Sequence, residues 1–231
     1  MLDELREEVF RANLALVESG LVLLTWGNAS GIDRGRGLVV IKPSGVDYAS
    51  MRPKHLVVVD LDGKVVEGEL RPSSDTPTHL ALYRAWADIG GVIHTHSTYG
   101  TAFAQAGEAI PCYGTTHADF CPGPIPCIRA LTRDEVETEY EANTGISIVE
   151  QYAKNNFKPL EYPGAVLMHH GPFAWGKTPM AAVTNGMILE NVAKMAVITR
   201  QIRPSVEDIP AYITEKHYTR KHGANAYYGQ K

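Results

Sequence analysis

Two Thr-Pro pairs, Thr76-Pro77 and Thr178-Pro179, constrain the fold most, because each marks a helix start that follows shorter apolar segments. Threonine is a favoured N-cap, and proline suits the first helical turn, where its missing N–H group needs no partner. The pairs predict helices over residues 76–87 and 178–200. Apolar and β-branched segments around them predict strands, so we expect one α/β domain with a mixed sheet covered by helices.

The first third of the chain predicts a helix followed by short strands. Apolar residues recur at spacings of three and four from Leu2 to Leu16, and Gly20 can end such a helix. The expected strands are residues 21–25, 38–42, 56–60 and 65–66. Asp62-Gly63 suits a hairpin turn between the last two, so this part of the sheet should be antiparallel. Later segments predict a strand over residues 91–97 and a helix over residues 208–222.

Composition and charge exclude several classes of function. The chain has 231 residues, and 22 Lys and Arg against 26 Asp and Glu give a net charge of -4. Such a surface does not attract nucleic acid or an anionic membrane, so an anionic substrate must be held locally. The acidic start lacks signal-peptide features and no segment could span a bilayer, which predicts a cytosolic protein. Cys112, Cys121 and Cys127 lack Cys-x-x-Cys spacing and favour buried thiols over disulfides or a zinc ribbon.

His94-Thr95-His96, at the end of an expected strand, is the sharpest chemical signal. Side chains alternate along a strand, so both imidazoles should face the same side and can share one metal ion. A purely structural pair of hydrogen-bonded histidines explains the pattern about equally well.

A second apolar segment, residues 164–170, delivers His169 and His170 just before an expected Gly171-Pro172 turn. Only one of these two histidines can face the His94–His96 pair, and each alone is explained by a hydrogen-bonded histidine at a strand end. Three imidazoles from two strands would match a catalytic zinc site, which keeps one coordination position open.

Three polar segments, residues 26–31, 42–45 and 72–77, are candidates for binding a phosphate group. The last precedes a helix, where hydroxyls, backbone N–H groups and the positive helix end favour an anion. The other two are glycine-containing turns rich in donors. Taken singly, each is explained by helix capping or chain reversal. Together they suit an anion cradle that lacks a phosphate-loop lysine motif.

Six segments along the chain form a recognisable set: LTWGN at 24–28, IKPSGV at 41–46, PSSDTPTH at 72–79, HTHS at 94–97, GTTHAD at 114–119 and KHGANAYYGQ at 221–230. This set closely resembles the L-ribulose-5-phosphate 4-epimerases, a branch of the class II aldolase and epimerase superfamily. The resemblance runs essentially end to end. GTTHAD and the YYGQ tail indicate the epimerase branch more specifically than the shared His-x-His segment does.

The resemblance implies a three-layer α/β/α fold with a central mixed, mostly antiparallel sheet. It also implies homotetramers whose sites lie between adjacent subunits. The implied ligands of zinc, or of manganese or cobalt, are His94, His96 and His170, with Asp75 as a fourth ligand or close neighbour. The implied phosphate and substrate contacts are Gly27, Asn28, Ser44, Gly45, Ser73 and Ser74.

The resemblance assigns acid–base roles to Asp119 and Tyr228, and a tyrosine so near the chain's end can serve a neighbouring subunit's site. From residue type alone, Asp119 is equally a turn former and Tyr228 a packing residue of the tail. The chain departs from the family at Met168 and His169, where more polar residues are expected. His169 is therefore a surplus imidazole beside the implied ligand His170.

The implied reaction interconverts L-ribulose 5-phosphate and D-xylulose 5-phosphate. The hydrogen on carbon 4 is not alpha to the ketone, so removing it gives no stabilised anion. Breaking the C3–C4 bond instead gives the enediolate of dihydroxyacetone and glycolaldehyde phosphate. A divalent cation can stabilise the enediolate by several kcal/mol, and a held phosphate retains the aldehyde while it rotates. Re-addition to the other face needs a proton-transfer group on each side.

Two alternatives share these features. A class II aldolase of the L-fuculose-phosphate type uses the same metal and phosphate groups but releases the aldehyde. A non-catalytic interaction module similar to the adducin head domain has the same fold, although the histidine set counts against it. The sequence leaves open whether such an epimerase serves L-arabinose or L-ascorbate breakdown, because both use the same epimerisation.

Overall fold

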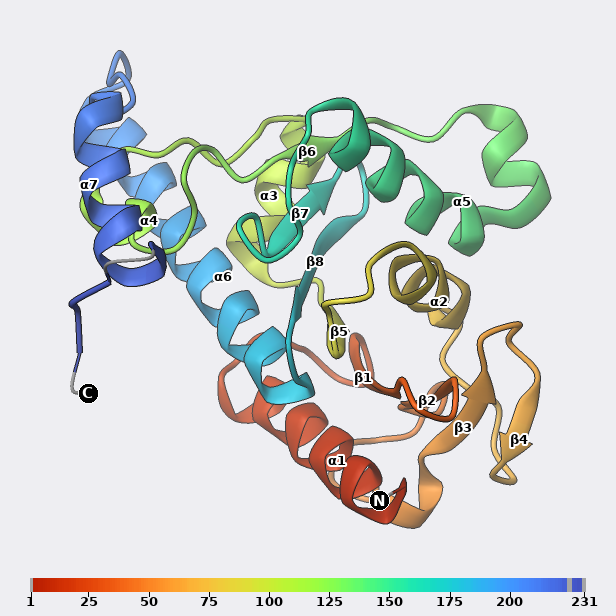
Figure 1. The fold of residues 1–231 in the computed structure, drawn as a ribbon. Coiled ribbons are helices and arrows are strands. Elements are labelled where there is room, and N and C mark those ends of the chain that lie inside the picture. The colour runs from red at the N-terminus through yellow and green to blue at the C-terminus, as the bar shows by residue number, and fades with distance from the viewer. Residues whose placement is uncertain (1, 224–225, 230–231) are drawn as a thin grey trace.

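An eight-stranded mixed sheet forms the middle layer of the computed structural model, which describes residues 2–223 and 226–229 (Figure 1). The strands run in the order β4-β3-β2-β1-β5-β8-β7-β6. Every neighbouring pair is antiparallel except β6 and β7. The strands are β1 Asn28–Asp33, β2 Leu38–Ile41, β3 Val57–Asp60, β4 Val65–Glu67, β5 Gly91–His94, β6 Cys127–Ile128, β7 Gly164–Leu167 and β8 Gly171–Gly176.

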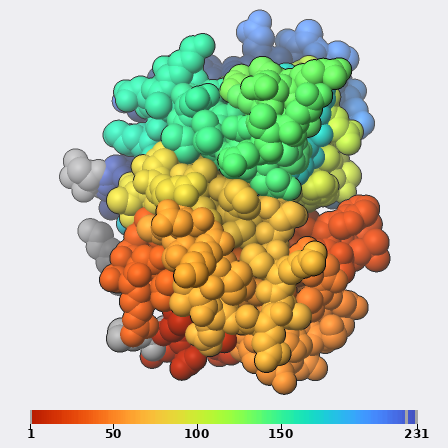
Figure 2. Space-filling model, turned by 90° about the vertical axis from the view of Figure 1, so that its right-hand side faces the viewer, coloured from red at the N-terminus to blue at the C-terminus, as the bar shows by residue number. Residues whose placement is uncertain are grey.

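Helices cover both faces of the sheet, which confirms the expected α/β/α architecture. They are α1 Leu2–Glu18, α2 Thr76–Ala85, α3 Thr98–Ala106, α4 Thr115–Ala118, α5 Arg133–Lys154, α6 Pro179–Ile202 and α7 Ala211–His222, with a short 3₁₀ turn at Pro53–His55. Figure 2 shows α5 in green and teal over the upper half of one side and the β3–β4 region in orange below it. None of the described helices has the length and apolar character needed to cross a membrane.

The strand side chains alternate between two cores, as the period of a strand requires. Val39 and Val59 belong to the core under α2 and α5. Val40 and Val58, the neighbours of those residues, pack on the opposite side with Val9 of α1. The sheet is therefore buried on both faces, and polar groups of the central strands reach a site only where those strands end.

The Thr-Pro pairs lie at the helix starts that the sequence predicts. The hydroxyl oxygen of Thr178 accepts a hydrogen bond from the Ala181 N–H group at 3.1 Å and caps α6. At α2 the N-cap is instead Asp75, and the Thr76 hydroxyl donates to the Ser73 carbonyl at 2.6 Å. That shift by one residue leaves the Asp75 carboxylate available at the end of the helix.

The strand expected over residues 21–25 is wrong. This segment forms a turn and irregular backbone, with Leu24 at φ 54° in the left-handed region and both Leu23 and Leu24 exposed. The strand begins later, at Asn28, in a polar segment that was expected to be a turn. Gly31 is needed there, because a Cβ atom would lie 2.8 Å from Leu5 and 2.9 Å from Val9 of α1. Close helix packing thus overrides the weak strand propensity of residues 28–31.

Two other boundaries differ from expectation near the histidines. The strand expected over residues 91–97 ends at His94, so His96 lies in the link to α3. Gly171 and Pro172 do not form a turn but begin β8, and the turn precedes them at residues 168–170. Strand alternation therefore cannot explain how His96 comes to face His94.

A candidate metal and phosphate site

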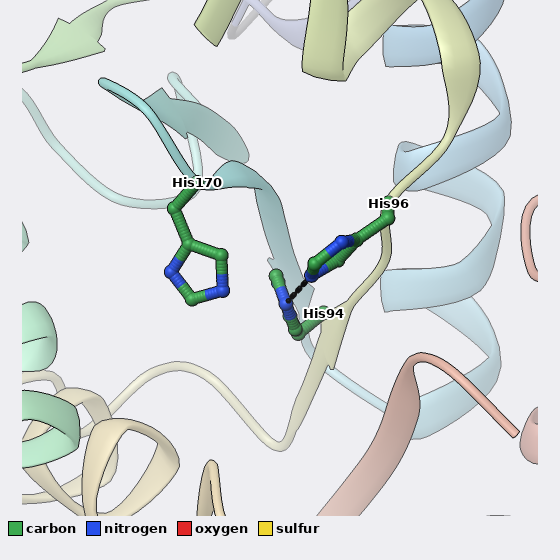
Figure 3. Close-up of side chains that lie close together, drawn as sticks. All are labelled: His94, His96 and His170. Carbon is green, nitrogen blue, oxygen red and sulfur yellow. Dashed lines mark hydrogen bonds between the residues drawn. The ribbon is translucent and has the colours of Figure 1, made fainter. Parts of the chain in front are cut away.

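Three imidazoles meet where β5 ends and the β7–β8 turn begins. Antiparallel pairing sets His94 opposite Phe173, which brings His170 close to the end of β5. One ring nitrogen from each of His94, His96 and His170 lies within 4.8 Å of the other two. The Nε2 atoms of His94 and His96 are 3.0 Å apart, with the His170 ring facing them (Figure 3).

Hydrogen bonds orient two of these rings toward a shared centre. Nδ1 of His94 donates to the Pro172 carbonyl oxygen at 3.0 Å, since a carbonyl can only accept, and this leaves Nε2 as a lone-pair donor. Nδ1 of His170 lies 3.3 Å from the Tyr140 hydroxyl. Ring nitrogens from three different segments of the chain thus face one shared centre.

Desolvation favours the neutral, metal-binding form of these imidazoles, although only His94 is fully buried and His96 is exposed. Desolvation lowers the pKa of His94 and of His96, and it lowers the pKa of His170 to about 3. Three neutral imidazoles with facing nitrogens fit a divalent transition metal such as zinc, with a position left for substrate. The described residues therefore suit the metal that the sequence predicts.

His169 is not a member of the cluster and does not line the cleft beside it. It is exposed and has φ 66°, in the left-handed region that non-glycine residues rarely adopt. The turn is closed by the His170 N–H group, which donates to the Leu167 carbonyl at 3.0 Å. Of the two candidates that the sequence left open, His170 is the one that faces His94 and His96.

Asp75 lies in the same cleft and is held by Asn28. The Asn28 amide donates to an Asp75 carboxylate oxygen at 2.6 Å and to the Ser73 hydroxyl oxygen at 3.0 Å. Burial acts to raise the pKa of Asp75, but the His94 and His79 imidazoles and the Asn28 amide outweigh it, so the pKa is lowered. An ionised carboxylate therefore stands beside the imidazoles.

A cleft of about 530 Å³ extends from the imidazoles along the loops that precede β1 and follow β2. It is lined by all six of the predicted substrate contacts: Gly27, Asn28, Ser44, Gly45, Ser73 and Ser74. Gly27 has φ 86°, and a Cβ atom there would lie 2.9 Å from the His94 carbonyl oxygen. A side chain at that position would strain the backbone and crowd the metal cluster.

Lys42 also lines this cleft. It lies in the candidate segment 42–45 but was not among the individual contacts that the sequence predicts. It follows the apolar strand β2 and is only 2% exposed, with its ammonium 4.6 Å from the centre of the Tyr48 ring. The ammonium lies 3.4 Å from both the Thr25 and the Pro43 carbonyl oxygens, two long contacts to neutral acceptors, and the ion pairs among the described residues give it no carboxylate partner within salt-bridge distance. Desolvation lowers the pKa of Lys42 to about 8, although Asp47 opposes the shift. The signal that the sequence offers for an anion-binding residue here is a lysine at the end of an expected strand and before the donor-rich segment Pro43-Ser44-Gly45.

Tyr140 and Glu141 also line the cleft and were missed. They belong to α5, whose helical geometry breaks at Glu139 with φ -133° and ψ 70°. Figure 1 shows the two parts of α5 running in different directions past α2. No residue in the sequence around this kink is a glycine or proline, so the sequence carried no signal for it.

Asp119 and Tyr228 lie in a different part of the molecule. Asp119 ends α4, and Figure 1 shows α4 against α7 at one edge of the fold, away from β1 and β5. The Asp119 carboxylate accepts hydrogen bonds from His217 at 2.9 Å and Arg220 at 2.8 Å, and Lys221 lies 3.3 Å away. The Tyr228 ring lies under Lys221, with 4.4 Å from the ammonium to the ring centre. Neither residue is among those that line the histidine cleft.

The cationic neighbours set the charge of Asp119. Burial acts to raise its pKa, but hydrogen bonds from Arg220, His217 and Lys221 outweigh this and lower the pKa to about 2. With these partners from its own chain, Asp119 is an ionised carboxylate at neutral pH. Ala224, Asn225 and Gln230 of the predicted KHGANAYYGQ motif lie outside the described residues.

Comparison with known proteins agrees with this geometry. Residues 7–197 match the family model described as the class II aldolase and adducin N-terminal domain. The chain is 58% identical over 230 residues to the L-ribulose-5-phosphate 4-epimerase UlaF of Salmonella paratyphi C (strain RKS4594), with 100% of both chains covered. The same enzyme of Salmonella choleraesuis (strain SC-B67) gives the same identity and coverage.

A solved L-fuculose 1-phosphate aldolase is 27% identical and superposes with a TM-score of 0.77, covering 93% of this chain and 94% of the aldolase. The same layers of helices and strands thus recur at low identity. The chain belongs to the class II aldolase and adducin N-terminal domain family.

Proposed function

We propose that this protein is an L-ribulose-5-phosphate 4-epimerase, which interconverts L-ribulose 5-phosphate and D-xylulose 5-phosphate with the help of a divalent metal. The observation that carries the proposal is one cleft in which three neutral imidazoles adjoin a buried ammonium and several hydroxyl and amide donors. The choice of an epimerase is supported by 58% identity over the full length of a protein with that name.

His94, His96 and His170 would hold the metal, with Asp75 as a further ligand or a charged neighbour. When bound, a divalent ion supplies Lewis-acid stabilisation of negative charge on substrate oxygens, worth several kcal/mol. Zinc suits three imidazoles best by geometry, and manganese or cobalt can bind the same donors.

The phosphate of the substrate would bind at the other end of the cleft. Lys42 supplies positive charge, and Asn28, Ser44, Ser73 and Ser74 supply polar groups. Lys42, Asn28 and Ser73 are buried, whereas Ser44 and Ser74 are exposed at the mouth of the cleft. Charge-assisted hydrogen bonds are strong enough to retain a fragment after its carbon–carbon bond breaks. Cleavage of C3–C4 leaves an aldehyde tethered by this phosphate, and rotation exposes its other face to attack.

Asp119 and Tyr228 would move the proton of the C4 oxygen, one on each side of the fragment. Asp119 and Tyr228 lie at the α4–α7 edge and do not line the histidine cleft of the same chain. We therefore propose that they act at the site of a neighbouring subunit in a homotetramer. The tail of this single class II aldolase-like domain would then complete the neighbour's site. The location expected for such a metabolic enzyme is the cytosol.

An aldolase is the second candidate, since a solved L-fuculose 1-phosphate aldolase has the same fold. The two functions differ in the fate of the aldehyde, which an aldolase releases. An adducin-like interaction module is disfavoured by the cluster of three facing imidazoles, which such a module does not need.

The test is incubation of zinc-loaded protein with L-ribulose 5-phosphate while D-xylulose 5-phosphate and free glycolaldehyde phosphate are followed in parallel. We expect xylulose 5-phosphate to form, to stop forming with a chelator and to return with zinc. Accumulation of free aldehyde without the epimer would replace the epimerase by an aldolase. If the protein binds zinc but does not convert L-ribulose 5-phosphate, the proposed substrate is wrong.

A further inference from the structure

Glu190 of α6 makes contacts that neither the fold nor the proposed chemistry has used so far. Its carboxylate accepts three hydrogen bonds from the start of α3: from the Ser97 hydroxyl at 2.7 Å, from the Tyr99 N–H at 2.9 Å and from the Gly100 N–H at 2.8 Å. It is separated from these donors by about ninety positions in the chain, so this contact exists only in the folded protein.

Glu190 takes over the capping of α3. Ser97 is the N-cap residue, but its side chain accepts no capping hydrogen bond, because the Tyr99 and Gly100 N–H groups donate to Glu190 instead. A carboxylate is the strongest acceptor for free N–H groups at a helix start, where the helix dipole also favours negative charge. Glu190 thus fixes both the position and the direction of the first turn of α3.

This turn begins one residue after His96. The segment from His94 to Ser97 links β5 to α3. The Thr95 N–H still donates to the Pro172 carbonyl at 3.2 Å, but His96 itself belongs to no strand or helix. With the Ser97 hydroxyl and two following N–H groups tied to Glu190, the backbone that carries His96 has little freedom. The 3.0 Å approach of the His96 and His94 Nε2 atoms depends on that backbone.

The same turn also reaches His94 by a second route. Gly100 packs so closely on Pro172 that a Cβ atom would lie 3.0 Å from the proline ring. The Pro172 carbonyl accepts the hydrogen bond that orients His94. Glu190 holds Gly100, and Gly100 packs on Pro172. Glu190 therefore also affects the position of the carbonyl that sets the tautomer of His94.

We infer that Glu190 is a positioning residue of the histidine cluster, which holds His96 through Ser97 and His94 through Gly100 and Pro172 in the geometry that binds a divalent cation. This inference rests on the proposed metal function of the cluster. Outer groups that orient metal ligands typically change metal affinity by roughly 10–100-fold when removed. An affinity change of that size, without direct contact to the metal, is the signature of such a role.

The experiment compares zinc dissociation constants of the whole protein and of Glu190→Ala, Glu190→Gln and Ser97→Ala, by competition with a chromogenic chelator. Thermal unfolding of the metal-free proteins is measured in parallel. Glu150→Gln is the matched control, because it makes the same chemical change at an exposed position on α5. We expect Glu190→Ala to weaken zinc binding about tenfold or more, Glu190→Gln to weaken it less because one acceptor oxygen remains, and Glu150→Gln to leave it unchanged.

Glu190→Gln and Ser97→Ala keep the test decisive if Glu190→Ala does not fold. Both should weaken zinc binding, and their double variant should lose less than the sum of the single effects, because they share one hydrogen bond. Unchanged zinc affinity in folded Glu190 variants, with only a lower unfolding temperature, would overturn the inference and leave the proposed function standing. Wild-type protein that binds zinc but does not epimerise would overturn the proposed function and still measure the effect of Glu190.

Discussion

The histidine cleft and the edge formed by α4 and α7 contain the two parts of the predicted site, and they are built differently. In the cleft, three imidazoles from separate segments, of which His94 is buried and His96 exposed, bring ring nitrogens together beside a buried lysine. At the edge, Asp119 is tied to Arg220, Lys221 and the His217 imidazole, and Tyr228 is 61% exposed. The described residues of one chain thus bring together the candidate metal and phosphate groups, whereas the proposed proton-transfer residues lie at another edge of the fold.

Loss of the metal cluster should have the largest effect. His96→Ala removes one of three imidazoles, so we expect bound zinc and activity to disappear together, since several kcal/mol of stabilisation correspond to roughly 10³-fold in rate. Metal analysis of the purified variant and the coupled assay check this. His169→Ala is the control and should keep both. Full zinc occupancy and normal turnover in His96→Ala would remove the cluster from the mechanism.

Variants at the α4–α7 edge should separate chemistry from metal binding. We expect Asp119→Asn and Tyr228→Phe to keep the zinc content of the wild type and to lose roughly 10²–10⁴-fold in epimerisation, the range of general acid–base catalysis. Zinc content and rate are measured on the same preparations. Wild-type rates in both variants would leave these residues with a structural role.

Mixing the two kinds of variant tests where the edge acts. His96→Ala and Tyr228→Phe are unfolded together, refolded as a mixture and assayed. If each site combines histidines of one chain with Tyr228 of another, random assembly gives about a quarter of the sites a complete set. A mixture no more active than its components would mean that both groups serve the same chain.

The buried lysine gives the cleft its own pH dependence. Lys42 has a pKa lowered to about 8 by burial, so it is charged below that pH and neutral above it. We expect kcat/KM for the phosphorylated substrate to fall as the pH rises through about 8, by up to about tenfold per unit, because kcat/KM reports the free enzyme. Lys42→Gln should have a lower kcat/KM without this alkaline decline. A wild-type profile that stays flat to pH 9.5 would contradict an anchoring role.

The smallest effect is expected at His169. A non-glycine residue in the left-handed region costs about 1–2 kcal/mol, and glycine loses roughly 0.5–1 kcal/mol of that gain through chain entropy. His169→Gly should therefore raise the free energy of unfolding by about 0.5 kcal/mol and leave zinc binding unchanged. Urea unfolding of the metal-free protein measures it. A clear loss of stability would show that the imidazole itself holds the turn.

Much of the secondary structure could be predicted from the sequence, and the errors have physical causes. The Thr-Pro pairs located α2 and α6 because capping is decided within four residues. Strand β1 was missed because Asn28, Ser30 and Gly31 have weak strand propensity, and only its pairing with β2 and β5 makes it a strand. The kink in α5 that brings Tyr140 to the cleft likewise has no local signal.

The sequence by itself determined the chemical inventory of the site: the histidines, the donor-rich turns and the family pattern, all of which are carried by short segments. The tertiary structure decided which of them meet. Pairing of β5 with β8 joins His94 to Pro172 across 78 positions and brings in His170 rather than His169. The tertiary structure also buries Lys42 beside the cleft and places Asp119 at another edge of the fold. Such choices depend on long-range packing and desolvation, which no local pattern encodes.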